Sequence, residues 1–328
     1  MAQKLQALDQ VIDVSGWASE DNYSPYPEGA RAKTAYICPE SVDVEYPFLI
    51  PKHKYLFKES NPNYPDQYWV EIIAYMIGEH TGVAVPPAFV SYDSLHMKCG
   101  ALIEWFYDRP SEACINSFFA GGHYMTLLIP HYDSKKGTKH NFRTVELLSR
   151  VLSKEHMLED SFIHYWGKVF IFDALIGNTD RHQDNWGLVW RNSRNKDGLI
   201  GESVAKFSPA FDNGTAMGHE ILERNLSKFK DIDFIKRYVA KGCHHMKWTL
   251  SDTKPLNFQE FTVRFLEKYP ESRDTMLRVL SFDMDVVVED IVKLTKFDVI
   301  TPLSEGRASF ICKLLRYRHK QLTELIQA

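Results

Sequence analysis

The order of apolar and polar positions predicts a strand-rich first third of the chain. Short apolar runs at residues 53–58, 89–92 and 99–103, bounded by turn-forming residues, are typical of strands. Between them, the apolar residues of segment 67–82 recur at the period of an amphipathic helix. We therefore expect a small antiparallel sheet and one helix in this part of the chain.

The remainder of the chain has mainly the helical period. Residues 189–190 and 205–207 are exceptions, because they are short apolar pieces that we expect to pair as a hairpin. The segment 121–140 is expected to be mostly loop. The expected helices cover residues 111–119, 142–152, 158–176, 220–240, 257–269, 271–280, 284–294 and 304–326. The two parts together predict an α+β protein.

The composition is that of a globular protein without a basic excess. The chain has 328 residues, of which 44% are hydrophobic, and this is enough for one large domain or two lobes. Its formal net charge is -4 at pH 7, whereas nucleic-acid-binding domains are usually basic. We therefore expect no direct contact with nucleic acid.

The cysteines and histidines show no disulfide or metal pattern. Five scattered cysteines without C-x-x-C spacing favour a reducing compartment. His244 and His245 follow Cys243 but have no spaced partner, so we expect exposed polar histidines there. No run approaches the roughly 20 apolar residues of a membrane span, and residues 1–15 lack a signal-peptide pattern. We expect a soluble, cytoplasmic protein, although export into a host cell by a dedicated system would leave no mark here.

A polar stretch at residues 177–187 carries the chemistry that stands out in this chain. It follows an expected helix and precedes a short apolar strand. Asp180, Asn185 and the later Asp212 form a D-x4-N…D pattern. Each residue type alone is common in turns. Phosphoryl transfer needs all three, since one aspartate orients the attacking hydroxyl while an Asn and an Asp hold the magnesium that bridges the phosphates.

This stretch resembles the catalytic loop of the HipA-like serine/threonine kinases, and more distantly the D-R-H-x-x-N loop of phosphatidylinositol kinases. The resemblance implies a bilobal protein-kinase-like fold, with a sheet-containing small lobe over residues 1–104 and a mostly helical lobe over 105–328. It also implies ATP and Mg²⁺ as cofactors, with Asn185 and Asp212 as metal ligands. His182 is expected to support the loop beside Asp180.

A candidate phosphate loop lies at residues 27–35. Gly29 lets backbone N–H groups approach a phosphate closely, and Lys33 adds positive charge. A single glycine fits an ordinary surface turn as well. The segment nevertheless resembles the G-A-x-x-K-T-A phosphate loop of HipA-like kinases, which assigns ATP binding to Gly29, Ala30 and Lys33.

Lys58 ends the predicted strand 53–58, where a kinase carries the lysine that pairs with nucleotide phosphates. Lys54 is a competing candidate, and the family's L-F-K-type strand favours Lys58. Glu71 lies near the start of the helix that follows. A kinase uses a helix glutamate to pair with the strand lysine, but the helix dipole alone also favours glutamate there.

A hinge between the two lobes is expected where the strand 99–103 continues into residues 104–109. This segment is similar to the family's E-x-F-D-R hinge, whose backbone groups read adenine, and Glu104 and Phe106 are the matching positions. Tyr107 stands where the family often has Asp. A strand end followed by a charged turn would explain the same residues without a ligand.

The resemblance implies transfer of the γ-phosphoryl group of ATP to a Ser or Thr hydroxyl of a protein substrate. The family includes toxin kinases paired with DNA-binding antitoxins, and kinases exported into host cells. Candidate partners are an antitoxin or a small protein equivalent to the N-terminal subdomain of the toxin kinases, which this chain is expected to lack. Autophosphorylation near the phosphate loop would fall on Ser24, although the family's register points to Tyr26, and Ser15 and Ser19 are other candidates.

Three other functions fit parts of the pattern. A phosphatidylinositol-type lipid kinase would share D-R-H-x-x-N, but the chain has no basic stripe or apolar surface helix for a membrane. Small-molecule phosphotransferases usually show H-G-D-x-x-x-x-N, whereas Asn178 and Thr179 precede Asp180 here. An inactive nucleotide-binding pseudokinase remains an alternative, against which the joint presence of the catalytic residues argues.

Overall fold

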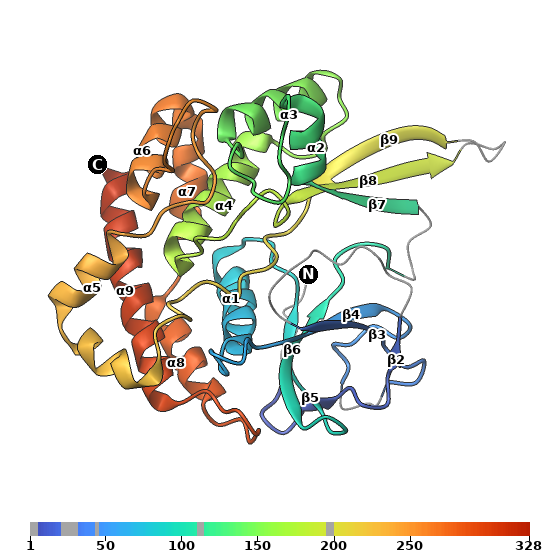
Figure 1. Cartoon of the computed structure of the whole chain (residues 1–328), viewed down its shortest axis with the longest axis vertical. Coiled ribbons are helices and arrows are strands. Elements are labelled where there is room, and N and C mark those ends of the chain that lie inside the picture. The colour runs from blue at the N-terminus through green and yellow to red at the C-terminus, as the bar shows by residue number, and fades with distance from the viewer. Residues whose placement is uncertain (1–5, 21–31, 43–45, 110–114, 195–199) are drawn as a thin grey trace.

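The computed structural model describes residues 6–20, 32–42, 46–109, 115–194 and 200–328 (Figure 1). A six-stranded sheet with the order β1-β5-β6-β4-β3-β2 occupies one end of the molecule. Only its β1–β5 pair is parallel, among the described strands. The strands are β1 (Ile12–Asp13), β2 (Ala18–Ser19), β3 (Lys33–Ile37), β4 (Lys54–Glu59), β5 (Ala88–Asp93) and β6 (Lys98–Glu104).

Strand β4 lies between β6 and β3 in this sheet, and its side chains alternate between the two faces of the sheet. Tyr55 and Phe57 point to one face, where they pack in a core cluster with Phe89 and Leu102. Because successive side chains of a strand alternate, Lys58 points to the other face. The helix α1 (Tyr68–Thr81) packs against β5 and β6 and ends at Gly82, which is left-handed at φ +66°. The predicted helix 67–82 and the predicted strands are confirmed.

A second, three-stranded sheet combines β7 (Ile115–Ala120), β8 (Gly187–Arg194) and β9 (Ile200–Phe207). The predicted hairpin is confirmed, and it is longer than the apolar pieces 189–190 and 205–207. The predicted helix at 111–119 is wrong, because its described part is strand β7, paired antiparallel with β8. A single edge strand has no helical or strand period of its own to reveal this pairing.

The helix α4 (Phe162–Ile176) packs against α3, α6, α7 and α9. The loop prediction for 121–140 is wrong at its start, where α2 forms. The predicted helix 220–240 is interrupted at Asp231, which caps α5 with its side chain. These elements are α2 (Gly121–Leu128), α3 (Phe142–Lys154), η1 (Glu223–Lys230), α5 (Ile232–Val239), α6 (Phe258–Lys268), η2 (Pro270–Ser272), α7 (Arg273–Val279), α8 (Met284–Leu294) and α9 (Glu305–Gln327).

The prediction of an exposed polar histidine at 244 is wrong. His244 is 1% exposed, and its ring packs against Phe170, Phe258 and Phe261. Burial lowers the pKa of His244 to about 3, so the ring is neutral at pH 7 and serves as an aromatic core residue. Within the described ranges, no group of three or more His, Cys, Asp or Glu side chains is arranged to hold a metal.

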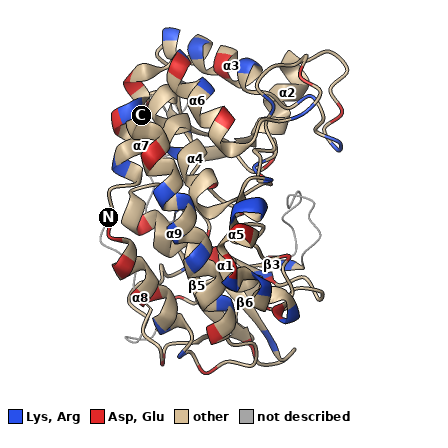
Figure 2. Cartoon of the chain, turned by 90° about the vertical axis from the view of Figure 1, so that its left-hand side faces the viewer, with Lys and Arg blue, Asp and Glu red and all other residues tan. Residues whose placement is uncertain are grey.

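The first sheet with α1 forms one lobe and the helices with the second sheet form the other, so the predicted bilobal α+β class is confirmed. We keep the boundary between residues 104 and 105 as a proposal. Figure 2 shows acidic and basic residues interspersed over α3, α6 and α8 on one face. None of the helices in the described ranges is long and apolar enough to cross a membrane.

Candidate active site

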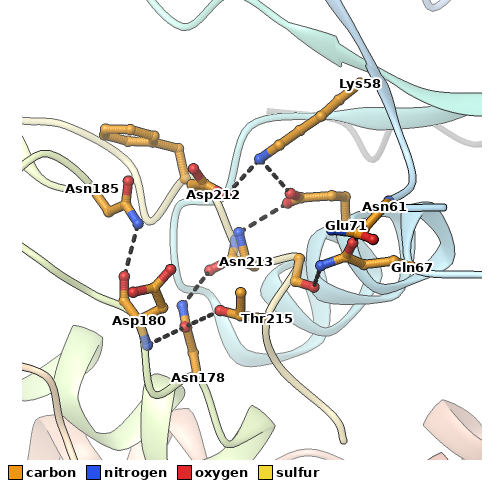
Figure 3. Close-up of polar contacts among 12 residues, drawn as sticks. Lys58, Asn61, Gln67, Glu71, Asn178, Asp180, Asn185, Asp212, Asn213 and Thr215 are labelled. Atoms are coloured by element: carbon orange, nitrogen blue, oxygen red, sulfur yellow. Dashed lines mark hydrogen bonds and ion pairs between the residues drawn. The ribbon is translucent and has the colours of Figure 1, made fainter. Parts of the chain in front are cut away.

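Three charged side chains from three separate segments meet between the lobes (Figure 3). The Lys58 Nζ on β4 lies 2.8 Å from Glu71 Oε1 on α1 and 2.5 Å from Asp212 Oδ1 after β9. The Lys58 and Glu71 side chains are 6% and 3% exposed, whereas that of Asp212 is 28% exposed. One buried ammonium group therefore joins two carboxylates, and Asp212 is the one that solvent or a ligand can reach.

Glu71 makes specific contacts in addition to its favourable position at the start of a helix. Its second carboxylate oxygen, Oε2, accepts a hydrogen bond of 2.9 Å from the Asn213 backbone N–H. The carboxylate thus connects the sheet lysine to the loop that carries Asp212. Lys54 points elsewhere and forms an ion pair of 3.3 Å with Glu20. Of the two candidate lysines, the structure brings Lys58 to the candidate site.

The Asp212 backbone has a conformation that costs free energy. Its φ is +56°, in the left-handed region that non-glycine residues rarely adopt. The neighbouring residues hold it there, since the Asn213 Nδ2 donates to Ala210 O at 2.8 Å and the Gln67 Nε2 donates to Gly214 O at 2.8 Å. These contacts fix the direction in which the Asp212 carboxylate points.

The loop with Asp180 begins directly after α4, which ends at the left-handed Gly177. Asn178 is fully buried and its side chain links this loop to the Asp212 loop. Its Oδ1 accepts hydrogen bonds from Asp180 N at 3.0 Å and Thr215 Oγ1 at 3.1 Å, and its Nδ2 donates to Asn213 Oδ1 at 3.3 Å. One amide side chain therefore fixes the position of the two loops relative to each other.

Asn185 has an unsatisfied oxygen. The residue is 1% exposed, and its Nδ2 donates to Asp180 O at 2.7 Å. Its Oδ1 is buried without a hydrogen-bond partner among the described residues. Leaving such an acceptor unpaired costs about 1–3 kcal/mol, which a cation can recover. An amide oxygen and a partly exposed carboxylate are oxygen ligands of the kind that Mg²⁺ prefers, so Asn185 and Asp212 fit the metal that the resemblance implies.

A buried ion pair lies beneath both loops. The Arg181 guanidinium contacts the two Asp173 carboxylate oxygens at 2.7 and 3.1 Å. It also donates to Asn213 Oδ1 at 2.7 Å, to Asn185 O at 3.2 Å and to Phe211 O. Burial opposes the charge on Arg181, but Asp173 outweighs it and holds the pKa of Arg181 above its ordinary value. One cation therefore fixes the backbone of both loops.

His182 forms part of the turn between Asp180 and Asn185. The His182 backbone N–H donates to Asp180 O at 2.7 Å, and the His182 backbone carbonyl accepts from Asn185 N at 3.0 Å. The ring Nδ1 accepts a hydrogen bond of 3.2 Å from the Asp184 backbone N–H. The His182 ring lies 5.8 Å from that of His245, whose pKa is lowered by burial and then by His182.

Glycines hold the first turn of α2 against this loop. The Gly121 N–H donates to Trp186 O and the Gly122 N–H donates to Gln183 O, both at 2.8 Å. A Cβ atom at Gly121 would lie 2.2 Å from the Trp186 ring. Only glycine therefore allows α2 to approach the loop this closely without a rearrangement.

The candidate hinge contributes an aromatic contact. The Phe106 ring stacks on that of Phe211, the residue before Asp212, with a centroid distance of 5.1 Å. The Glu104 carboxylate is buried in an ion pair of 2.5 Å with Arg109, and its backbone N–H donates to Pro87 O. The structure thus brings Phe106 to the site, whereas the Glu104 side chain has a partner within the hinge.

Comparison with known proteins gives matches in structure but not in sequence. The chain matches no protein-family model and no curated protein. The structure of the Helicobacter pylori proinflammatory kinase CtkA covers 96% of this chain and is itself covered to 96%, with a TM-score of 0.70 and 16% sequence identity. This chain has a kinase fold.

Two further solved structures are less similar to this kinase-fold chain. HipA of Shewanella oneidensis MR-1, solved with HipB and operator DNA, has 13% identity and a TM-score of 0.47 over 92% of this chain and 64% of its own. The Golgi casein kinase with Mn/ADP bound has 14% identity and a TM-score of 0.34 over 92% of this chain and 71% of its own.

Some predicted residues lie outside this cluster or outside the described ranges. Lys33 lies directly opposite Lys58 in the β3–β4 ladder. Gly29, Ala30 and Ser24 lie outside the described residues, as does Tyr26.

Sequence reasoning missed several residues that support the site. The signal for Asp173 was a lone carboxylate in the apolar second half of α4. The signal for Asn178 was its position between a helix-ending glycine and Asp180. The missed residues are Gln67, Asp173, Asn178, Arg181 and Asn213.

Proposed function

We propose that this chain is an ATP-dependent serine/threonine protein kinase of the HipA-like family. The observation that carries the proposal is the junction of Lys58 with Glu71 and Asp212. Asn185, five residues after Asp180, adds a buried amide oxygen that has no hydrogen-bond partner among the described residues. These residues have the types and positions that a kinase needs for phosphates, metal and acceptor hydroxyl.

In this proposal, Asn185 Oδ1 and the Asp212 carboxylate hold Mg²⁺, which neutralises charge on the phosphates when bound. Lys58, kept in place by Glu71, presents its ammonium group to the nucleotide phosphates. Asp180 accepts the proton of the substrate hydroxyl as that oxygen bonds to the γ-phosphorus. The bond between the γ-phosphorus and the bridging oxygen breaks, and ADP leaves with the bonding electrons.

The remaining predicted residues would complete the nucleotide site. The stacked Phe106 ring and the hinge backbone at Glu104 would contact adenine. Gly29, Ala30 and Lys33 would contact the phosphates through the loop before β3. His182 would keep Asp180 and Asn185 at their spacing, which its backbone hydrogen bonds to both residues support.

Regulation and partners follow from the family resemblance. We propose Ser24 as an autophosphorylation site that would place a phosphate close to the ATP loop. A toxin or effector role would require a protein substrate, and an antitoxin or a small N-terminal-subdomain-like protein would be its partner. Phosphosite mapping after incubation with ATP and Mg²⁺ tests the first point, and absence of phosphate between residues 15 and 35 would refute it.

The test of the proposed function is phosphate incorporation from labelled ATP, compared between the wild-type protein and Asp180→Asn. Acceptors are the protein itself, a generic protein substrate and phosphoinositide vesicles, each with Mg²⁺ and with Mn²⁺. We expect label on Ser or Thr of a protein, lost in the variant, which keeps the shape of the aspartate.

Each other outcome of this experiment identifies an alternative. Label in the vesicles would make the chain a lipid kinase. Binding of ATP without incorporation into any acceptor would indicate an inactive nucleotide-binding protein. Absence of ATP binding, in a protein that melts cooperatively, would refute the whole assignment.

A further inference from the structure

Three buried arginines differ in how their charge is compensated. Arg181, Arg307 and Arg318 are 2%, 4% and 4% exposed. Arg181 pairs with Asp173, and Arg307 pairs with Asp66, each at 2.7 Å. No carboxylate of the described chain lies within 4.0 Å of the Arg318 guanidinium. Because an unpaired buried cation is costly, Arg318 requires another source of negative charge.

The neighbours of Arg318 satisfy only part of its hydrogen-bonding capacity. Its Nη1 donates to Ile176 O at 3.1 Å. Tyr238 hydrogen-bonds to the guanidinium and donates its own hydroxyl hydrogen to Glu220 at 2.7 Å, so this carboxylate acts through the tyrosine. The Arg318 Nε is buried without a partner in the described part of the chain. Burial lowers the pKa of Arg318, as expected for an incompletely compensated charge.

A cavity of about 70 Å³ adjoins Arg318 between α4, α5, α6 and α9. Arg318 and Gln321 line it from α9, and Asn257 and Gln259 line it from the start of α6. The lining residues Ala240 and Gln259 are exposed, so the cavity is open to solvent. Figure 1 places α5, α6 and α9 on the side of the molecule away from the β7–β9 sheet. Since about 10–15 Å³ suffices for one water, the cavity has room for a tetrahedral oxyanion.

We propose that this cavity binds a small oxyanion of the phosphate class, with Arg318 as its counter-charge. The forked donors of a guanidinium match the oxygens of a phosphate. The Gln321 Nε2 donates one hydrogen to the Tyr317 hydroxyl at 2.7 Å and retains a second, and Gln259 is a further neutral side chain in the lining. None of the described residues that line the cavity is acidic, and the Glu220 carboxylate contacts Arg318 only through Tyr238, so the lining offers a cation no charged ligand.

An anion in this position would act on the end of α4. The Arg318 guanidinium covers Gly177, where a Cβ atom would lie 2.3 Å from the Arg318 Cζ. Ile176, whose carbonyl Arg318 contacts, and Gly177 immediately precede Asn178 and the loop of Asp180. Neutralising Arg318 in place would therefore stabilise the backbone that leads into the candidate active site.

Thermal unfolding of the full chain in inorganic phosphate, against chloride at equal ionic strength, tests the proposal. We expect a saturable rise in Tm, because a ligand that binds the folded state stabilises it by mass action. Gln321→Glu places a carboxylate three residues from Arg318 on the same helix face. We expect this variant to melt higher without phosphate and to bind phosphate at least about tenfold more weakly.

Gln327→Glu is the matched control, because it makes the same change at an exposed position of the same helix. It should keep the wild-type response. Lys58→Met removes the ammonium group of the candidate active site, to which a phosphate could also bind, and it should keep the response as well. The proposal is overturned if the wild type shows no saturable effect, if Gln321→Glu responds like the wild type, or if Lys58→Met loses the response.

The same assay with O-phosphoserine distinguishes the sources of the anion. A response to inorganic phosphate alone would assign the cavity to a free ion. A response to both would assign it to the phosphoryl group in general, including one carried by a phosphorylated side chain. A response to neither would overturn the proposal.

Discussion

Replacing Arg181 or Asp173 tests whether one buried ion pair organises the candidate site. Arg181 contacts both Asp173 oxygens, the Asn213 side chain and the carbonyl groups of Asn185 and Phe211. Asp173→Asn removes the negative charge but leaves the arginine its other acceptors. Arg181→Met removes every one of these contacts and leaves a carboxylate buried without a cation.

The structure sets the order of the two effects. Removing one partner of a buried ion pair costs about 3–5 kcal/mol. We expect Asp173→Asn to lie near the lower end of this range and Arg181→Met near or above the upper end, since each further hydrogen bond adds about 1 kcal/mol. The double variant should be no less stable than Arg181→Met, because asparagine removes the unpaired carboxylate. The two changes are therefore expected to be strongly non-additive.

Urea unfolding of the wild type, both single variants and the double variant measures these free energies. Initial rates of phosphate incorporation, taken where each variant is folded, measure the effect on the site. We expect Arg181→Met to lose more than about 100-fold in kcat, because both loops lose their common support. Additive losses below 1 kcal/mol each, or a wild-type kcat in folded Arg181→Met, would contradict this account of the pair.

Three further predictions concern separate features. Gly177→Ala and Gly82→Ala both place a Cβ at a left-handed helix end, but only Gly177 faces a guanidinium, at 2.3 Å, whereas Gly82 faces open space. In chemical unfolding, Gly82→Ala should therefore lower the free energy of unfolding by about 1 kcal/mol, and Gly177→Ala should lower it by clearly more. Equal losses in the two variants would refute the contact with Arg318. Because the pKa of His244 is lowered to about 3, the unfolded state binds the extra proton first, and stability falls as pH drops below about 6.5. Between pH 7 and pH 5 this amounts to about 2 kcal/mol, which His244→Phe should remove from the measured pH dependence, and an unchanged profile would count against it. Asn185→Leu should raise the Mg²⁺ concentration needed for half-maximal phosphate incorporation at least about tenfold, with little loss of Tm; an unchanged Mg²⁺ requirement would remove Asn185 from the metal site.

The local pattern of the chain was sufficient for most of the elements and for the central residues of the candidate site. Helical and strand periods are set by which side chains must be buried, so the helix α1, the strands β4–β6 and the hairpin β8–β9 follow from the sequence. Asp180, Asn185 and Asp212 stood out because their chemistry requires fixed residue types at a fixed spacing. The α+β content followed from these periods, and the bilobal kinase-like fold followed from the family resemblance of the motifs.

Tertiary structure decided the features that depend on contacts between distant segments. The strand β7 exists because β8 supplies its hydrogen-bond partners, and residues 111–119 alone do not reveal that pairing. His244 is buried because three phenylalanines enclose it. The sequence left open whether Glu71 interacts with the helix dipole or pairs with a lysine. The sheet decides this, because it places Lys58 within hydrogen-bond distance of Glu71. Likewise, only the packed helices place Arg318 beside a cavity and bury its Nε without a hydrogen-bond partner among the described residues. Burial and charge compensation are properties of three-dimensional neighbours, and the sequence order of the residues does not contain them.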